Sequence, residues 1–124
     1  MVGLVPLALL MIARQLSPSS QGLGTHQQLG LPPCSMRLIF GIRCPACGMT
    51  TSWSYFTRGQ WLDSVQVNSG GFLLALVACL GVVLSVICLV KPGVDLMRYQ
   101  KVAGITALCI ALVTFVDWAV RLYQ

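Results

Sequence analysis

Two long apolar runs in the second half of the chain set the architecture that the sequence predicts. Residues 72–90 are nineteen consecutive positions without a charge, and residues 102–120 form a second run of nineteen with a single charge, Asp117. A helix that crosses the hydrocarbon core of a bilayer needs roughly twenty apolar residues. Because only eleven residues separate the runs, residues 69–124 are predicted to form an antiparallel transmembrane hairpin.

A shorter apolar run opens the chain. Residues 2–13 carry no charge and end at Arg14, about eight residues fewer than a full span requires. No Lys or Arg precedes this run, and the Ser-Pro-Ser-Ser sequence at 17–20 is a poor signal-peptidase site. Three interpretations stay open for residues 1–16: a short or truncated spanning helix, which we favour, an uncleaved signal anchor, or a cleaved signal peptide.

Polar and apolar positions mix between these runs, over residues 17–68. Residues 17–33 have the Ser, Gly, Gln and Pro content of a linker, and residues 49–67 resemble one or two short amphipathic helices broken at Arg58-Gly59. The plausible N-caps are Thr50, Thr51 and Ser52. Since Trp and Tyr in this segment favour the membrane–water interface, residues 17–68 are predicted to form a cap that lies on the membrane surface.

Side-chain spacing makes two further predictions for the spans. Small residues recur at every fourth position, which favours close packing of neighbouring helices. They are Ala103, Ala107 and Ala111 in the second run, and Gly81 and Ser85 in the first. Asp117 precedes Arg121 by four residues, the spacing of an ion pair on a helix surface. We therefore interpret Asp117 as half of an interfacial ion pair, which disfavours a channel or transporter.

Composition agrees with a membrane location. Hydrophobic residues make up 56% of the chain and charged residues 9%, against roughly 25% charged residues in a typical soluble domain. The net charge is +5, but the eight Lys and Arg are scattered, so a nucleic-acid partner is not expected. The expected surroundings are the lipid bilayer, with other membrane proteins as candidate partners. Lys91, Arg98 and Lys101 favour a cytoplasmic loop at 91–101 and an extracytoplasmic cap.

The segment spaced for chemistry is Cys44-Pro45-Ala46-Cys47-Gly48. A C-x-x-C pair at the start of a helix has its thiol pKa lowered by the helix dipole and free N–H groups, so Cys44 and Cys47 are candidate redox thiols. A second interpretation adds His26 and Cys34, which makes one nitrogen and three sulfurs, a ligand set that suits tetrahedral zinc. A third is a structural disulfide from Cys34 to Cys44 or Cys47. The remaining cysteines lie inside apolar runs and resemble buried packing residues: Cys79, Cys88 and Cys109.

Residues 34–71 resemble a family of small bacterial multi-pass membrane proteins of unknown function. The family's mark is a C-P-x-C-G-[LM]-T-R motif after an upstream cysteine, which corresponds here to residues 44–50 and Cys34. Thr51 stands where the family has its arginine, for which Arg58 is a candidate substitute, and Ser69 stands where the family has a proline. The resemblance implies a bacterial inner-membrane protein and points to the cysteine block, but it brings no established reaction.

Together these patterns predict an all-α membrane protein with two spans, a short N-terminal helix and a cysteine-bearing cap. The first functional hypothesis is a non-enzymatic structural or interaction module whose cap is held by thiols or by a metal such as zinc. The alternative is a membrane thiol–disulfide redox component that uses the Cys44/Cys47 pair.

Overall fold

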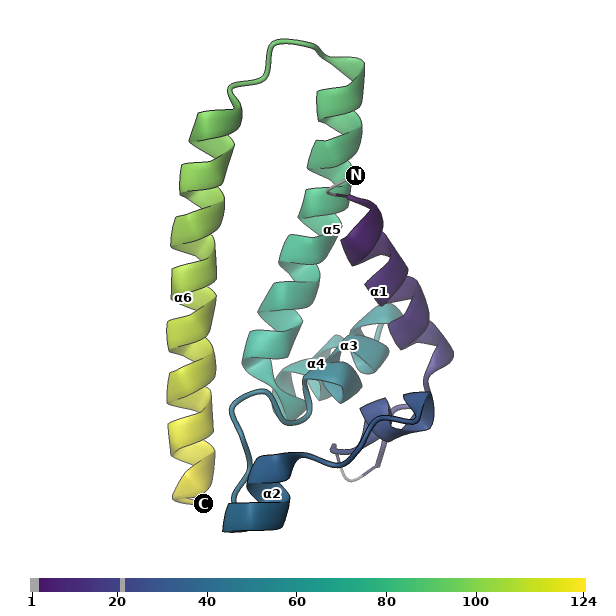
Figure 1. Ribbon diagram of the computed structural model, residues 1–124, viewed down its shortest axis with the longest axis vertical. Coiled ribbons are helices and arrows are strands. Elements are labelled where there is room, and N and C mark those ends of the chain that lie inside the picture. Colours follow the sequence, from purple (N-terminus) through teal and green to yellow (C-terminus); the bar gives the residue numbers. More distant parts are fainter. Residues whose placement is uncertain (1–2, 21) are drawn as a thin grey trace.

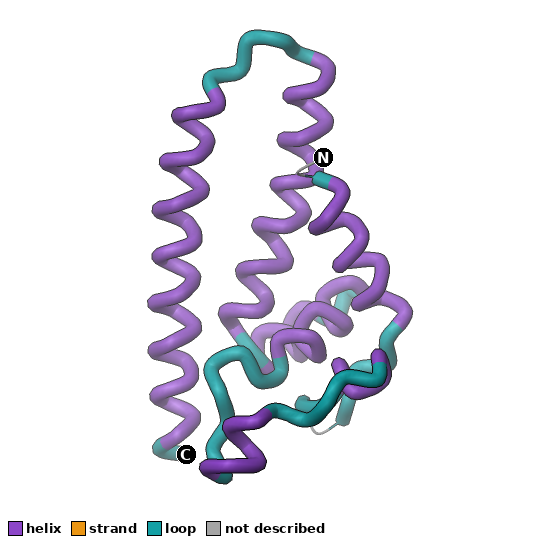
Figure 2. Tube along the Cα trace, viewed as in Figure 1, coloured by secondary structure: helices purple, strands orange, loops and turns teal. Residues whose placement is uncertain are grey.

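The computed structural model describes residues 3–20 and 22–124, which are helical apart from turns and loops (Figures 1 and 2). The helices are α1 (Leu4–Gln15), the 3-10 helix η1 (Thr25–Leu29), α2 (Ser35–Phe40), α3 (Met49–Thr57), α4 (Trp61–Val67), α5 (Ser69–Val90) and α6 (Leu96–Leu122). Figure 1 shows α5 and α6 as two long rods joined at one end, with α2, α3, α4 and η1 gathered at the other end. The predicted all-α architecture with two long apolar helices is confirmed.

Helices α5 and α6 are long and apolar enough to cross a membrane. Their 22 and 27 residues correspond to lengths of about 33 and 40 Å at a rise of about 1.5 Å per residue. In the most apolar stretch of each helix, only 11% of the residues of α5 and 6% of those of α6 are buried. A core helix of a soluble protein would be covered by its neighbours, so this exposure fits helices that face lipid.

The α5–α6 connection is shorter than the sequence predicts. A loop is expected over residues 91–101, whereas α6 begins at Leu96. Asp95 explains the difference, because its Oδ1 accepts the backbone N–H groups of Met97 and Arg98 at 3.1 and 3.3 Å. A side chain that satisfies the free N–H groups of a first turn stabilises a helix start at that position.

The predicted small-residue packing of the two spans is wrong. The close approach is at Gly70, where an added Cβ would lie 2.8 Å from Thr114 Cβ. An added Cβ at Gly81 would meet no described atom within 4 Å, and Ser85 packs against Gly3 of the N-terminal segment instead. The exposed alanines of α6 are Ala103, Ala107 and Ala111. The helices diverge away from the cap, so only residues near the cap bring them together (Figure 1).

Hydroxyl side chains form much of the buried interior of the cap. Helix α3 packs against α1, α4 and α5, and five of the buried polar residues there carry hydroxyl groups: Thr25, Thr51, Ser52, Ser54 and Ser64. The hydroxyls pair with one another or with backbone carbonyls, at 2.6 Å between Thr25 and Thr51 and 2.8 Å between Ser52 and Ser64. Buried polar groups that find such partners avoid a desolvation penalty of about 1–3 kcal/mol each.

This buried network corrects the predicted start of α3. Thr51 and Ser52 lie inside the helix with buried side chains, and the N-cap residue is Gly48, whose φ is +85°. Their hydroxyls bond to residues of η1 and α4, so they join helices rather than cap one. The predicted break at Arg58-Gly59 is confirmed, because α3 ends at Thr57 and Gly59 has a φ of +79°.

Candidate thiol site

Three of the six cysteines converge at the end of the molecule opposite the α5–α6 turn. The Sγ atoms of Cys34, Cys44 and Cys47 all lie within 4.8 Å of one another, and those of Cys44 and Cys47 are 3.0 Å apart. All three are free and partly exposed. Cys34 directly precedes α2, and the turn from Cys44 to Cys47 precedes α3, so two helix starts meet at the sulfurs.

A glycine lets the cysteine turn pack tightly. Gly48 has a φ of +85°, and a Cβ at this position would lie 2.8 Å from the carbonyl oxygen of Gly22. The left-handed conformation and the close backbone approach both favour glycine here.

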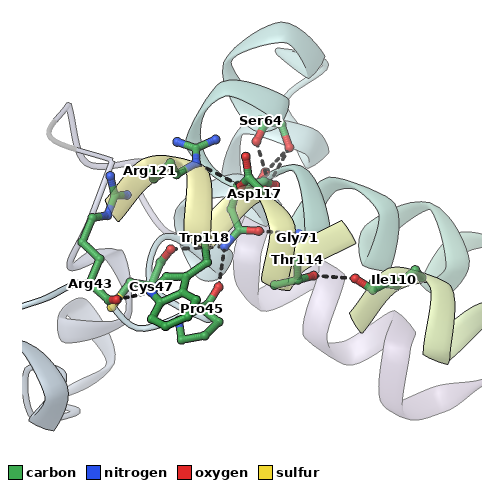
Figure 3. Close-up of polar contacts among 12 residues, drawn as sticks. Arg43, Pro45, Cys47, Ser64, Gly71, Ile110, Thr114, Asp117, Trp118 and Arg121 are labelled. Carbon is green, nitrogen blue, oxygen red and sulfur yellow. Dashed lines mark hydrogen bonds and ion pairs between the residues drawn. The ribbon is translucent and has the colours of Figure 1, made fainter. Parts of the chain in front are cut away.

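Asn68 joins the cysteine turn to the start of α5. Its Nδ2 donates to the carbonyl oxygens of Pro45 and Cys47, both at 3.2 Å, while its Oδ1 accepts the backbone N–H of Gly71 at 2.8 Å (Figure 3). Only 3% of the Asn68 surface is exposed. Both ends of one buried amide are therefore used, one to cap α5 and the other to hold the turn.

The end of α6 contacts the same segment from the other side. Trp118 Nε1 donates to the carbonyl oxygen of Arg43, the residue before the motif (Figure 3). One turn later in sequence, Arg121 Nε bonds to Asp117 Oδ2 at 2.9 Å, with both side chains about a quarter exposed. The predicted ion pair is thus confirmed. The backbone of residues 43–47 is held by the side chains of Asn68, the N-cap residue of α5, and of Trp118 in α6.

The environments of the thiols differ. Backbone N–H groups at the start of α2, chiefly that of Arg37, lower the pKa of Cys34 to about 7, and the neighbouring Cys44 and Cys47 thiols add to this shift. Burial raises the pKa of Cys47 to about 12, with a further contribution from the two other thiols. Cys34 is therefore close to half ionised at neutral pH, whereas Cys47 remains protonated. The sequence interpretation considered only Cys44 and Cys47 as redox thiols, although the position of Cys34 before a short helix was a signal for its acidity.

His26, the fourth predicted metal ligand, lies outside the sulfur cluster. It belongs to η1, and its Nε2 is 3.2 Å from the carbonyl oxygen of Pro32. A cavity of about 370 Å³ is nevertheless lined by His26, by Arg37 and by the three clustered cysteines. The fold therefore brings three of the four candidate ligands together and places the imidazole on the wall of the adjoining cavity.

Other residues considered for the site lie elsewhere. Arg58 Nη2 donates to the carbonyl oxygens of Leu16 and Arg14, at 2.9 and 3.2 Å, so its guanidinium caps the end of α1. The cysteines of the long helices are partly or fully exposed and do not join the cluster: Cys79, Cys88 and Cys109. Their predicted burial is wrong for the isolated chain, because α5 and α6 have few protein neighbours along their length.

The sulfur geometry allows two kinds of chemistry. In a tetrahedral zinc site with Zn–S bonds of about 2.3 Å, neighbouring sulfurs lie about 3.8 Å apart, and the three Sγ atoms need only small side-chain movements to reach that spacing. A disulfide needs an S–S distance of about 2.05 Å, which Cys44 and Cys47 reach by closing their gap of 3.0 Å.

Comparison with known proteins bears on this segment alone. Residues 34–82 match the model of a family described as "Protein of unknown function (DUF2752)". No curated protein and no solved structure matches the chain. The matched segment begins at Cys34, contains all three clustered cysteines and Asn68, and ends within α5. Over the part that builds its thiol site, this chain is similar to an uncharacterised protein family.

Proposed function

We propose that this protein is a small integral membrane protein whose cap binds a thiophilic metal ion, with zinc as the first candidate. The observation that carries the proposal is the convergence of three sulfurs within 4.8 Å. Cys34 is separated from Cys44 by ten positions, so a metal bound to both would cross-link two segments of the cap. Such a link makes the cap a metal-held structural or interaction module, without a catalytic role.

Charge and protonation support metal binding. Cysteine binds zinc as the thiolate, and the pKa of Cys34 of about 7 makes one thiolate accessible near neutral pH. Cys47, with its raised pKa, must release its proton to solvent when the metal binds, so binding should weaken as the pH falls. Arg37 on the cavity wall carries a positive charge beside the negative three-thiolate site. His26 Nε2 is the proposed fourth ligand and would exchange its bond to Pro32 for the metal.

The proposed setting is the bacterial inner membrane, with α5 and α6 as the spans. The Lys and Arg residues near the α5–α6 turn favour a cytoplasmic turn, which leaves the cap on the extracytoplasmic face. Helix α1, with 12 residues, is too short to cross alone and packs against α5 and α3. We propose that it enters the membrane only partway, alongside α5.

A native intact mass of detergent-purified protein, taken without reductant, tests the metal proposal. One bound zinc ion should appear, and it should be lost from Cys34→Ser, Cys44→Ser and Cys47→Ser. Cys79→Ser and Cys109→Ser are matched controls that should keep the metal. His26→Gln should weaken binding without abolishing it. A metal-free protein of unmodified mass after zinc addition, or equal loss from both sets of variants, refutes the proposal.

The alternative function is thiol–disulfide exchange, favoured by the distance of 3.0 Å between the Cys44 and Cys47 sulfurs. One thiolate of the pair would attack a disulfide in a substrate protein, forming a mixed disulfide and releasing one substrate thiolate. The second cysteine, once deprotonated, would attack the mixed disulfide and release the other. Two electrons pass to the substrate, and the pair becomes a disulfide. A mass two hydrogens lower that is lost in Cys44→Ser and in Cys47→Ser but kept in Cys34→Ser supports this alternative over zinc and over a structural disulfide from Cys34.

A further inference from the structure

We propose that Arg43 and Arg121 form a binding site for the phosphodiester headgroup of a membrane lipid, beside the thiol cluster, whose Cys44 and Cys47 also line one of its two cavities. Arg43 lies between α2 and the cysteine turn, and Arg121 lies in the last turn of α6. Both side chains are drawn in Figure 3, on the same side of the contact between Trp118 and the cap. The fold thus brings two guanidinium groups together from positions 78 residues apart.

Two cavities share these arginines. One has a volume of about 230 Å³ and is also lined by Asn68, Asp117 and Trp118. The other has a volume of about 290 Å³, and its wall includes Tyr55, Asp63 and Gln66. Both cavities are lined by Val67, Arg43 and Arg121, so the two arginines lie at their common boundary. An anion at this boundary would be reached by both arginines.

The donor groups of the two arginines are largely unused. Arg121 commits its Nε to Asp117, which leaves its two Nη groups, and the guanidinium of Arg43 makes no hydrogen bond or ion pair with any described residue. Guanidinium forks match phosphate oxygens in pairs and form hydrogen bonds stronger than neutral ones. The phosphate group is therefore the ligand chemistry that fits these free donors.

Charge favours a singly charged phosphodiester over a free phosphate ion. The two cavities together are lined by two arginines and by two carboxylates, Asp117 and Asp63, so their formal charges sum to zero. A phosphodiester adds one negative charge to this site. A phosphate dianion adds two and is repelled more strongly by both carboxylates, at a cost in binding free energy.

The surroundings favour a lipid as the source of the phosphodiester. Trp118 and Tyr55 line the cavities, and such side chains are typical of the membrane–water interface. On the same helix as Arg121, apolar side chains are exposed along the bilayer-facing surface, with Val116 at 59% and Val120 at 52%. Acyl chains of a lipid held by the arginines would cover this surface.

The test is native mass spectrometry of the full chain in detergent, after incubation with phosphatidylglycerol, diacylglycerol or inorganic phosphate. One retained phosphatidylglycerol is expected on the native protein, and diacylglycerol should not be retained. Arg43→Gln and Arg121→Gln should each weaken retention by about tenfold, as expected for the loss of a charge-assisted hydrogen bond. The matched control is Arg98→Gln, at the opposite end of α6, which should retain lipid as the native protein does.

The outcomes distinguish a lipid ligand from a free phosphate ion, and both of these from a wrong proposal. If millimolar phosphate displaces the lipid and binds with the same dependence on both arginines, the phosphate site stands and its source is a free ion. Retention that is unchanged in the Arg43→Gln/Arg121→Gln double variant overturns the proposal. So does equal loss in Arg98→Gln. Circular dichroism of each variant checks that the fold is kept. The hydrogen bond from Trp118 goes to the backbone carbonyl of Arg43, so replacing the Arg43 side chain should leave this bond in place.

Discussion

Replacing Asn68 should separate helix capping from control of the cysteine turn. Asn68→Asp keeps an oxygen where Oδ1 accepts the Gly71 N–H, so the cap of α5 persists. The same change removes Nδ2 and its two hydrogen bonds to the Pro45 and Cys47 carbonyls. In Asn68→Ala the cap and both donors are lost together. The pair of variants therefore distinguishes the two roles of one side chain.

The expected magnitudes follow from the number of lost hydrogen bonds. An N-cap contributes about 1 kcal/mol, and each hydrogen bond lost from a buried group costs about 1 kcal/mol. Asn68→Ala should therefore lower the free energy of unfolding by about 3 kcal/mol. Asn68→Asp should lower it by about 2 kcal/mol, with an added cost because a carboxylate would face two carbonyl oxygens. The burial of Asn68, 3% exposed, leaves little room for water to replace these bonds.

Thermal unfolding in detergent measures the stability of both variants, and zinc affinity or thiol alkylation reports on the turn. The Asn68→Asp variant should lose a larger share of zinc affinity than of helix content, because its damage falls on the carbonyls of the cysteine turn. If Asn68→Asp matches the native protein in both stability and thiol behaviour, the two carbonyl hydrogen bonds do not hold the turn, and the reasoning fails.

Two further predictions follow from the contacts described above. Gly70→Ala should destabilise the α5–α6 contact by about 1–3 kcal/mol, because the new Cβ would lie 2.8 Å from Thr114 Cβ. Thr114→Ala should partly restore the stability of this variant, and the control Gly81→Ala should be neutral. Equal melting temperatures for the two glycine variants would contradict the packing. In reduced, metal-free protein, the alkylation rate of Cys34 should rise with pH with a midpoint near 7, because the thiolate is the nucleophile, while Cys47 should react slowly until far higher pH. Site-resolved mass spectrometry after iodoacetamide pulses measures both rates. A midpoint shared by the two thiols would be inconsistent with their different environments.

Local sequence patterns were sufficient to predict the long helices and the cysteine segment. The charge-free run at 72–90 and the run at 102–120 correspond to α5 and α6, because a long apolar segment satisfies its backbone as a helix regardless of its neighbours. The sequence also predicted the Arg58-Gly59 break and the Asp117–Arg121 ion pair, since both depend on residues within one turn of each other.

Contacts between residues far apart in the sequence were decided by the tertiary structure alone. The sequence contains Cys34, Cys44 and Cys47, but only the packing of α2 and the cysteine turn brings their sulfurs within 4.8 Å, while His26 stays on a cavity wall. The contact of Gly70 with Thr114 likewise could not be predicted from the sequence, because small residues also recur at every fourth position where the two helices diverge. Spacing along a helix determines which residues share a face, whereas the angle between helices decides which faces meet.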